Sequence, residues 1–269
     1  MDQFNVYKDM KARTNGEIYI GVVGPVRTGK STFIKRFMNL MVLPNIEDEN
    51  DRNRANDELP QSSSGKTIMT TEPKFVPNEA VSIKTEEGIE LNVRLIDCVG
   101  YMVEGATGHM EGEEERLVKT WFDYEIPFTK AAAIGTKKVI TEHSTIGVVV
   151  TCDGSFGEIA AKQYEPAEEE TIKQLKALKK PFVVLLNTIH PYSESTKQLA
   201  AEKEEKYQTK VLPMNLEQMK KEDIYEIIKS VLMEFPISSI GFYVPRWTEM
   251  LKKDHPLKME LLQMARDVI

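Results

Sequence analysis

Apolar segments rich in Val, Ile and Leu alternate along this chain with longer segments whose apolar residues recur at helical spacing. This alternation is typical of βαβ units, in which helices cover both faces of a mainly parallel sheet. The short apolar segments predict strands, and the segments of helical period predict helices. The expected strands are residues 18–23, 75–84, 91–97, 145–151, 181–187 and 210–213, and the expected helices are residues 31–41, 128–142, 167–179, 193–207 and 216–235.

The connection between the second and third expected strands is short and polar, and it ends in Gly88. A connection of this length joins antiparallel neighbours, because a parallel crossover needs a dozen or more residues. We therefore predict an α/β fold with a mainly parallel sheet, one antiparallel edge strand and helices on both faces.

Three stretches depart from the alternation. Residues 44–67 are polar, and residues 100–125 combine glycines with an acidic cluster, so both are predicted to be long loops. They are either solvated insertions or functional loops, and their place beside candidate phosphate motifs favours function. Beyond Phe235 the pattern predicts a strand over residues 236–247 and a helix from Glu249 to Ile269 without a stop signal. The predicted organisation is an N-terminal arm (1–16), a nucleotide domain (17–236) and the start of a further domain (237–269).

Charge and cysteine usage narrow the class of protein. A net charge of -7 and a pI near 5.4 argue against a surface that binds nucleic acid broadly. No apolar run approaches the roughly 20 residues that span a bilayer, and residues 1–16 lack a secretory signal. Cys98 and Cys152 lie in apolar segments, which indicates two buried thiols rather than a disulfide. We expect a cytoplasmic protein without a transmembrane segment.

The first candidate site follows the first expected strand and precedes the first expected helix. Backbone amides of such a glycine loop bind phosphates, Lys30 reaches the outer phosphates, and the Ser31 hydroxyl ligates magnesium. We include Thr32, the next residue, in this nucleotide site. The alternative is a glycine-rich turn with an incidental lysine, but the strand and helix on either side favour a phosphate-binding loop (P-loop). The residues that match G-x-x-x-x-G-K-[ST] are Gly24, Pro25, Val26, Arg27, Thr28, Gly29, Lys30 and Ser31.

A second motif, D-x-x-G, ends the strand predicted over residues 91–97. Asp97 is expected to hold magnesium through water, and the Gly100 amide to meet the terminal phosphate. Between the two motifs, Thr70 or Thr71 could coordinate the metal and sense the terminal phosphate. The alternative for both threonines is that they only open the next strand.

The order of these motifs over residues 18–235 resembles the GTPase-like class of P-loop proteins. In that class a guanine-reading N/T-K-x-D follows the strand that here ends at Asn187, which we keep as a nucleotide-binding residue. His190 stands where the aspartate is expected, which argues against guanine specificity. Tyr101 replaces the glutamine that orients water in many signalling GTPases.

Arg27 is the candidate that assists hydrolysis. It holds the P-loop position at which guanylate-binding proteins, with a similar G-x-x-R-T-G-K-S, carry an arginine supplied in cis. Such an arginine is worth about 10³ to 10⁵ in kcat. The alternatives are a solvated arginine and Lys66 as the rival donor.

Residues 24–42, 57–77, 97–101 and 142–151 together resemble the stage IV sporulation protein A family of spore-coat ATPases, over the N-terminal part of its members. The resemblance implies ATP and Mg²⁺ as cofactors, with hydrolysis driving self-assembly into a homopolymer on the mother-cell side of the outer forespore membrane. It also implies recruitment by a small amphipathic membrane-bound peptide and contacts with spore-coat proteins, mainly through regions outside this chain. The alternatives are a regulatory GTPase that never polymerises and a structural protein that keeps its nucleotide as a fixed cofactor.

Overall fold

A computed structural model describes residues 17–60, 72–84, 90–111, 114–157, 159–235 and 244–268. The chain divides into two compact units, residues 1–235 and residues 236–269. Among the described residues, no helix is both long and apolar enough to cross a bilayer. Cys98 and Cys152 are both free and buried, as predicted.

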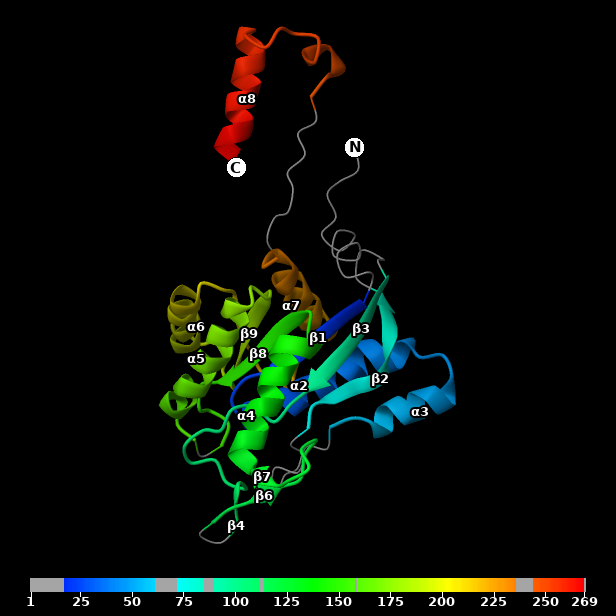
Figure 1. Ribbon diagram of the computed structural model, residues 1–269, viewed down its shortest axis with the longest axis vertical. Helices are drawn as coiled ribbons and strands as arrows, with labels where there is room; N and C mark the ends of the chain where they lie inside the picture. The colour runs from blue at the N-terminus through cyan, green and yellow to red at the C-terminus, as the bar shows by residue number, and fades with distance from the viewer. Residues whose placement is uncertain are drawn as a thin grey trace. The chain divides into compact units, whose positions relative to one another are not determined.

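The main sheet of the first unit has six strands in its described part, in the order β10-β9-β8-β1-β3-β2 (Figure 1). All neighbouring strands pair in parallel except β2, which is antiparallel to β3. The structure thus confirms the predicted mainly parallel sheet with one antiparallel edge. The strands are β1 (Glu17–Val23), β2 (Lys74–Lys84), β3 (Glu90–Asp97), β8 (Ile146–Cys152), β9 (Phe182–Asn187) and β10 (Val211–Met214).

Helices cover both faces of this sheet (Figure 1). On one face, α2 (Lys30–Phe37) and α7 (Lys221–Met233) pack against the alternate β1 residues Ile18, Ile20 and Val22. The opposite face buries Val23 with the turn that continues α4 and with residues of α5 and α6. Strand residues that alternate between two apolar cores explain why the strands read as nearly continuous apolar runs. The helices of the second face are α4 (Phe128–Lys138), α5 (Ala161–Ala177) and α6 (Glu194–Tyr207).

Two helices begin away from their predicted positions. The α5 helix begins at Ala161 rather than at residue 167, because Gln163 accepts from the Ala160 N–H at 3.1 Å and so caps the helix ahead of Pro166. The α7 helix begins at Lys221 rather than at residue 216. There the Asp223 carboxylate accepts from the preceding N–H, that of residue 220, at 2.7 Å. The apolar residues Leu216 and Met219 are buried in the loop before α7. The apolar pattern therefore predicted a helix start that is too early.

The polar stretch 44–67, predicted to be a loop, contains the helix α3 (Glu49–Asp57). Asp48 caps this helix, since its Oδ1 accepts from the backbone N–H of Asn50 at 2.8 Å and of Asp51 at 3.0 Å. The prediction was wrong here because α3 buries only Ala55 and therefore has no apolar period.

Residues 100–125 are not one continuous loop either. They contain the short pair β4 (Met110–Glu111) and β5 (Glu114–Glu115), and β6 (Leu117–Val118), which pairs with β7 (Ile126–Pro127). Strands of two residues carry too little alternation to be seen in a sequence.

The second unit contains a 3₁₀ turn, Arg246–Thr248, and the helix α8 (Pro256–Val268). The helix expected from residue 249 therefore begins at Pro256, a residue suited to the first turn of a helix. The strand expected over residues 236–247 lies mainly outside the described residues, and its described end belongs partly to the 3₁₀ turn.

Candidate functional site

The glycine loop (residues 24–31) lies at the carboxyl end of β1. From β1 the chain continues to β3 on one side and returns to β8 on the other, and ligands of open α/β sheets bind where the strand order reverses in this way. The Gly24 backbone has φ +126°, and a Cβ there would lie 2.4 Å from the carbonyl oxygen of Val150 in β8. Only glycine lets the loop leave the sheet at this point.

The predicted D-x-x-G motif at the end of β3 docks directly on the glycine loop. Val26 N–H donates to the Tyr101 carbonyl at 2.9 Å, and Tyr101 N–H donates to the Gly24 carbonyl at 3.3 Å. At Gly100, with φ +95°, a Cβ would lie 2.1 Å from the Gly24 oxygen and 2.6 Å from Lys30 Nζ. The structure therefore brings the two sequence motifs together and leaves no room for a side chain between them.

Lys30 is buried at the first position of α2. Its Nζ donates to the Pro25 carbonyl at 2.5 Å, so the side chain lies back along its own loop. Burial lowers the pKa of Lys30, an effect that the nearby Asp97 carboxylate opposes. A partly desolvated cation in this position attracts an anionic group strongly.

The Asp97 carboxylate is the second polar group of this cluster. Burial raises its pKa to about 6, although the Lys30 charge and a hydrogen bond with the Ser31 side chain act in the opposite direction. Among the described residues, Asp97 Oδ1 is one of the few buried side-chain atoms without a hydrogen-bond partner. An open carboxylate oxygen next to a hydroxyl fits Mg²⁺, which uses one or two protein ligands together with phosphate oxygens and water.

Nothing in the described part of the chain gathers three or more His, Cys, Asp or Glu side chains into a metal site. One carboxylate and one hydroxyl, from Asp97 and Ser31, leave positions on a cation for phosphate, water or a further hydroxyl ligand. This composition suits a nucleotide-bound Mg²⁺ better than a resident Zn²⁺.

Two other predicted site residues have polar groups that already bond within the protein. The Gly100 N–H donates to Thr136 Oγ1 at 3.2 Å. Asn187 is buried; its Nδ2 donates to the Thr28 carbonyl at 3.0 Å, and its Oδ1 accepts from the Leu216 N–H at 3.2 Å. Asn187 thus braces the glycine loop against the segment between β10 and α7.

The side chains of Arg27 and Tyr101 each form a hydrogen bond with a residue outside the two motifs. Arg27 has φ 61°, and its Nη2 donates to Thr107 Oγ1 at 3.2 Å. The Tyr101 hydroxyl donates to Gln174 Oε1 of α5 at 2.8 Å, and burial raises the Tyr101 pKa to about 12. Tyr101 is thus a neutral phenol bound to α5, and it does not line the cavity beside Lys30 and Asp97.

A cavity of about 1010 Å³ opens beside this cluster, a volume at the upper end of the range for small-molecule sites. It brings together many of the predicted residues, whereas Gly24, Pro25, Thr28 and Gly100 are not in its lining. Thr70 and Thr71 lie outside the described residues. The predicted residues that line the cavity are Val26, Arg27, Gly29, Lys30, Ser31, Thr32, Asp97 and Asn187.

The cavity lining also contains residues that the sequence did not single out. Cys98 and Val99 lie inside the D-x-x-G motif and could have been found there. The others come from the end of α3, the start of β2 and two connecting loops. Those within residues 57–77 belong to a stretch that carries the family resemblance, but none of them was predicted to be a site residue. The other lining residues are Asp57, Glu58, Leu59, Pro60, Glu72, Pro73, Lys74, Phe75, Asn78, Phe156 and Glu217.

Comparisons with known proteins place the chain in a family. Residues 1–236 match the family described as Stage IV sporulation protein A, ATPase domain. Stage IV sporulation protein A of Clostridioides difficile (strain 630) is 54% identical over 98% of this chain and 54% of that protein. The protein of the same name from Bacillus anthracis is 49% identical over 100% of this chain and 55% of that protein.

Among solved structures, a variant of SsGBP aligns over 83% of this chain and 57% of that chain, with 14% identity and a TM-score of 0.45. This chain spans about half the length of the curated relatives that it matches. The family match, by contrast, covers all of the first compact unit. The chain belongs to the Stage IV sporulation protein A family, and residues 1–236 are an ATPase domain of that family.

Proposed function

We propose that this chain is a Mg²⁺-dependent ATP hydrolase of the GTPase-like P-loop class, and that its turnover drives self-assembly of the spore-coat basement layer. The observation that carries the proposal is the meeting of Lys30, Ser31 and the open Asp97 oxygen at the carboxyl ends of β1 and β3. The family match and the sporulation relatives support the same activity.

In this proposal the glycine loop holds the triphosphate. Its backbone amides and the start of α2, including Thr32, surround the phosphates. Lys30 leaves the Pro25 carbonyl to contact the outer phosphates, and the anion offsets the burial that lowers the Lys30 pKa. Gly100 approaches the terminal phosphate by giving up its bond to Thr136.

Ser31 and Asp97 would hold the magnesium, with Thr71 or Thr70 as a further ligand. Held by these residues, Mg²⁺ would supply positive charge to the outer phosphate oxygens. Replacing Thr70 and Thr71 together by alanine is expected to leave ATP bound and to slow hydrolysis, because Ser31 and Asp97 remain. Normal turnover in that double variant would remove both threonines from the mechanism.

Arg27 would supply the remaining charge. Tyr101 cannot orient water as an amide does, and its hydroxyl is bonded to α5. Arg27 lies in the cavity lining, and moving its guanidinium from Thr107 onto the developing charge would act only in the transition state. We expect this movement when a neighbouring subunit orders the surrounding loops, which couples assembly to chemistry.

The base preference follows from residues 187–190. The amide nitrogen and oxygen of Asn187 both bond to backbone atoms. His190 offers no carboxylate to the guanine ring. This supports ATP over GTP as the substrate. The partners in this proposal are further copies of the chain, a small amphipathic membrane-bound peptide and spore-coat proteins, on the cytoplasmic, mother-cell side of the forespore membrane.

One experiment separates this proposal from its alternatives: phosphate release and sedimentation are followed in the same sample with ATP, with GTP and with a non-hydrolysable ATP analogue. Release from ATP accompanied by pelleting, and no pelleting with the analogue, is expected. Faster release from GTP without pelleting would identify a regulatory GTPase. Nucleotide that stays bound without any release would identify a fixed cofactor.

A further inference from the structure

Within the described part of the chain, few contacts hold the helix α3 in place. It buries only Ala55, and a helix that is polar on all sides is not fixed by apolar packing. Asp48 caps its start, and Arg52 donates to the Ile46 carbonyl at 2.8 and 3.1 Å, but both bonds remain within neighbouring turns of chain. Apart from the core contacts of Ala55 and Leu59, the position of the helix relative to the sheet depends on polar contacts at its other end.

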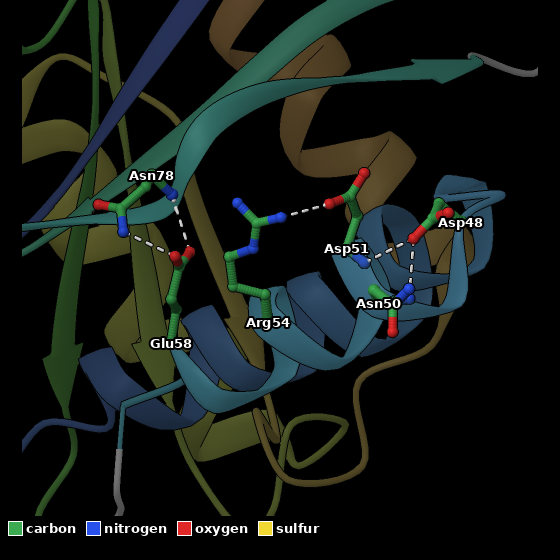
Figure 2. Close-up of polar contacts among 6 residues, drawn as sticks. All are labelled: Asp48, Asn50, Asp51, Arg54, Glu58 and Asn78. Carbon is green, nitrogen blue, oxygen red and sulfur yellow. Dashed lines mark hydrogen bonds and ion pairs between the residues drawn. The ribbon is translucent and has the colours of Figure 1, made fainter.

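That end is tied to β2 by Glu58, the first residue after α3. Glu58 Oε2 accepts from the backbone N–H of Asn78 at 2.9 Å, and Glu58 Oε1 accepts from Asn78 Nδ2 at 2.6 Å (Figure 2). On the same helix, Arg54 and Asp51 pair with each other at 2.6 Å, and the bond shown in Figure 2 does not reach the sheet. The paired carboxylate and amide, which we call the Glu58–Asn78 clamp, therefore link two segments that are distant in sequence.

An irregularity in β2 makes the clamp possible. Val76 pairs with Leu95 and Val81 pairs with Val93, so residues 77–80 of β2 lie opposite Arg94 alone. An irregular stretch of this kind leaves backbone groups outside the ladder and redirects the side chains. The Asn78 N–H is used by Glu58 rather than by β3.

Both clamp residues line the cavity of the candidate site. So do Pro60 and Glu72, and in the sequence Thr70 and Thr71 stand between these two residues. The clamp thus fixes the chain that enters this stretch to β2, the strand that follows the stretch. A wall held in this way would fix the distances between a bound nucleotide and the other residues that line the cavity.

We propose that Glu58 and Asn78 are positioning residues for ATP hydrolysis, acting through the cavity wall rather than by touching the phosphates. This inference rests on the proposed function. Because the clamp is accessible to solvent, its loss is expected to change global stability little. Its effect should fall on kcat, since misplacing reacting groups by about 1 Å can cost about 10²-fold.

The test measures kcat and KM for phosphate release from ATP, with the melting temperature of each variant. Glu58→Ala removes both hydrogen bonds and is expected to lower kcat by about 10- to 100-fold with little change in KM. Asn78→Ala keeps the backbone N–H and is expected to lose less.

A charge exchange tests the clamp without deleting a side chain. Asn78→Asp places two carboxylates against each other and is expected to lower kcat about as much as Glu58→Ala. Adding Glu58→Gln to this variant supplies an amide oxygen for the backbone N–H at position 78 and an amide donor for the new carboxylate. Both bonds return, so kcat is expected to recover to near the parent value.

Arg54→Ala is the matched control, because it breaks an exposed ion pair on the same helix and leaves the clamp intact. It is expected to keep the parent kcat. A parent chain that releases no phosphate would refute the proposed function itself. A parent that hydrolyses ATP while Asn78→Asp matches it, or a double variant that fails to recover, would overturn the positioning role alone.

Discussion

Two walls of one cavity are built in different ways. The glycine loop is fixed by buried backbone, with Gly24 against β8 and the D-x-x-G segment joined to it by main-chain hydrogen bonds. A second wall, at the end of α3, is held by the Glu58–Asn78 clamp and by the partly buried Leu59. The groups proposed to face the phosphates are thus positioned by the core of the sheet, whereas the wall at the end of α3 depends on a few described surface contacts. Substitutions in the loop should therefore cause large losses of ATP binding or kcat, whereas substitutions in the wall should cause smaller losses of kcat.

The largest effect is expected from Lys30→Ala. This change removes the buried ammonium proposed to contact the outer phosphates, so the Kd for ATP is expected to rise by about 10³-fold or more. Lys35→Ala, an exposed lysine on the same helix, is the control and should bind like the parent. Titration calorimetry gives both Kd values, and circular dichroism checks the fold. Unchanged affinity in Lys30→Ala would reject the loop as the phosphate site.

Arg27→Ala is expected to separate binding from chemistry at the same loop. If the guanidinium acts only in the transition state, kcat falls by about 10² to 10⁴ while the Kd for ATP stays near the parent value. Arg27→Lys should recover little, because a point charge cannot contact two oxygens as a guanidinium does.

Lys66→Ala, measured beside it, tests the rival donor. A large loss of kcat in that variant, with near-normal turnover in Arg27→Ala, would reverse the assignment.

The buried Asp97 carboxylate at the end of β3 makes the free energy of unfolding depend on pH. The pKa of Asp97 is raised to about 6, so the folded chain holds this proton more tightly than the unfolded chain does. The resulting stabilisation is full below about pH 4 and is lost as the pH rises to about 6. In nucleotide-free protein, the free energy of unfolding of the parent minus that of Asp97→Asn should fall by about 3 kcal/mol between pH 4 and 7.

Urea unfolding across this pH range makes the comparison, with Asp51→Asn on exposed α3 as the control for losing one carboxylate. If the difference in free energy of unfolding between the parent and Asp97→Asn does not change with pH, the pKa of Asp97 is not raised in the folded chain.

The smallest effect is expected at the wall from Asp48→Ala. Losing this N-cap costs about 1 kcal/mol, which corresponds to about fivefold faster amide exchange in α3. Because the clamp at the other end remains, turnover should change much less than in Glu58→Ala. Hydrogen exchange and phosphate release, measured on one preparation, test the two statements together. A loss of turnover equal to that of Glu58→Ala would mean that the whole helix, rather than its clamped end, positions the wall.

The same contrast explains what the sequence could predict. The strands, the antiparallel edge and the meeting of Lys30 with Asp97 follow from apolar periods and motif spacing, because burial leaves a regular trace in sequence. The helix α3 leaves no such trace because it buries only Ala55. The clamp leaves none because it joins two polar residues at an irregular stretch of β2. The starts of α5 and α7 were misplaced for a related reason: side-chain caps, from Gln163 and Asp223, decide where a helix begins.

The most direct test of the account is the rate of phosphate release by this chain from ATP and from GTP, with Mg²⁺ and with EDTA. Release from ATP is expected to require Mg²⁺ and to exceed release from GTP, because the loop, Ser31 and Asp97 are proposed to form the phosphate and metal site while His190 offers no carboxylate to guanine. Equal or faster release from GTP, or release from ATP that persists in EDTA, would contradict it.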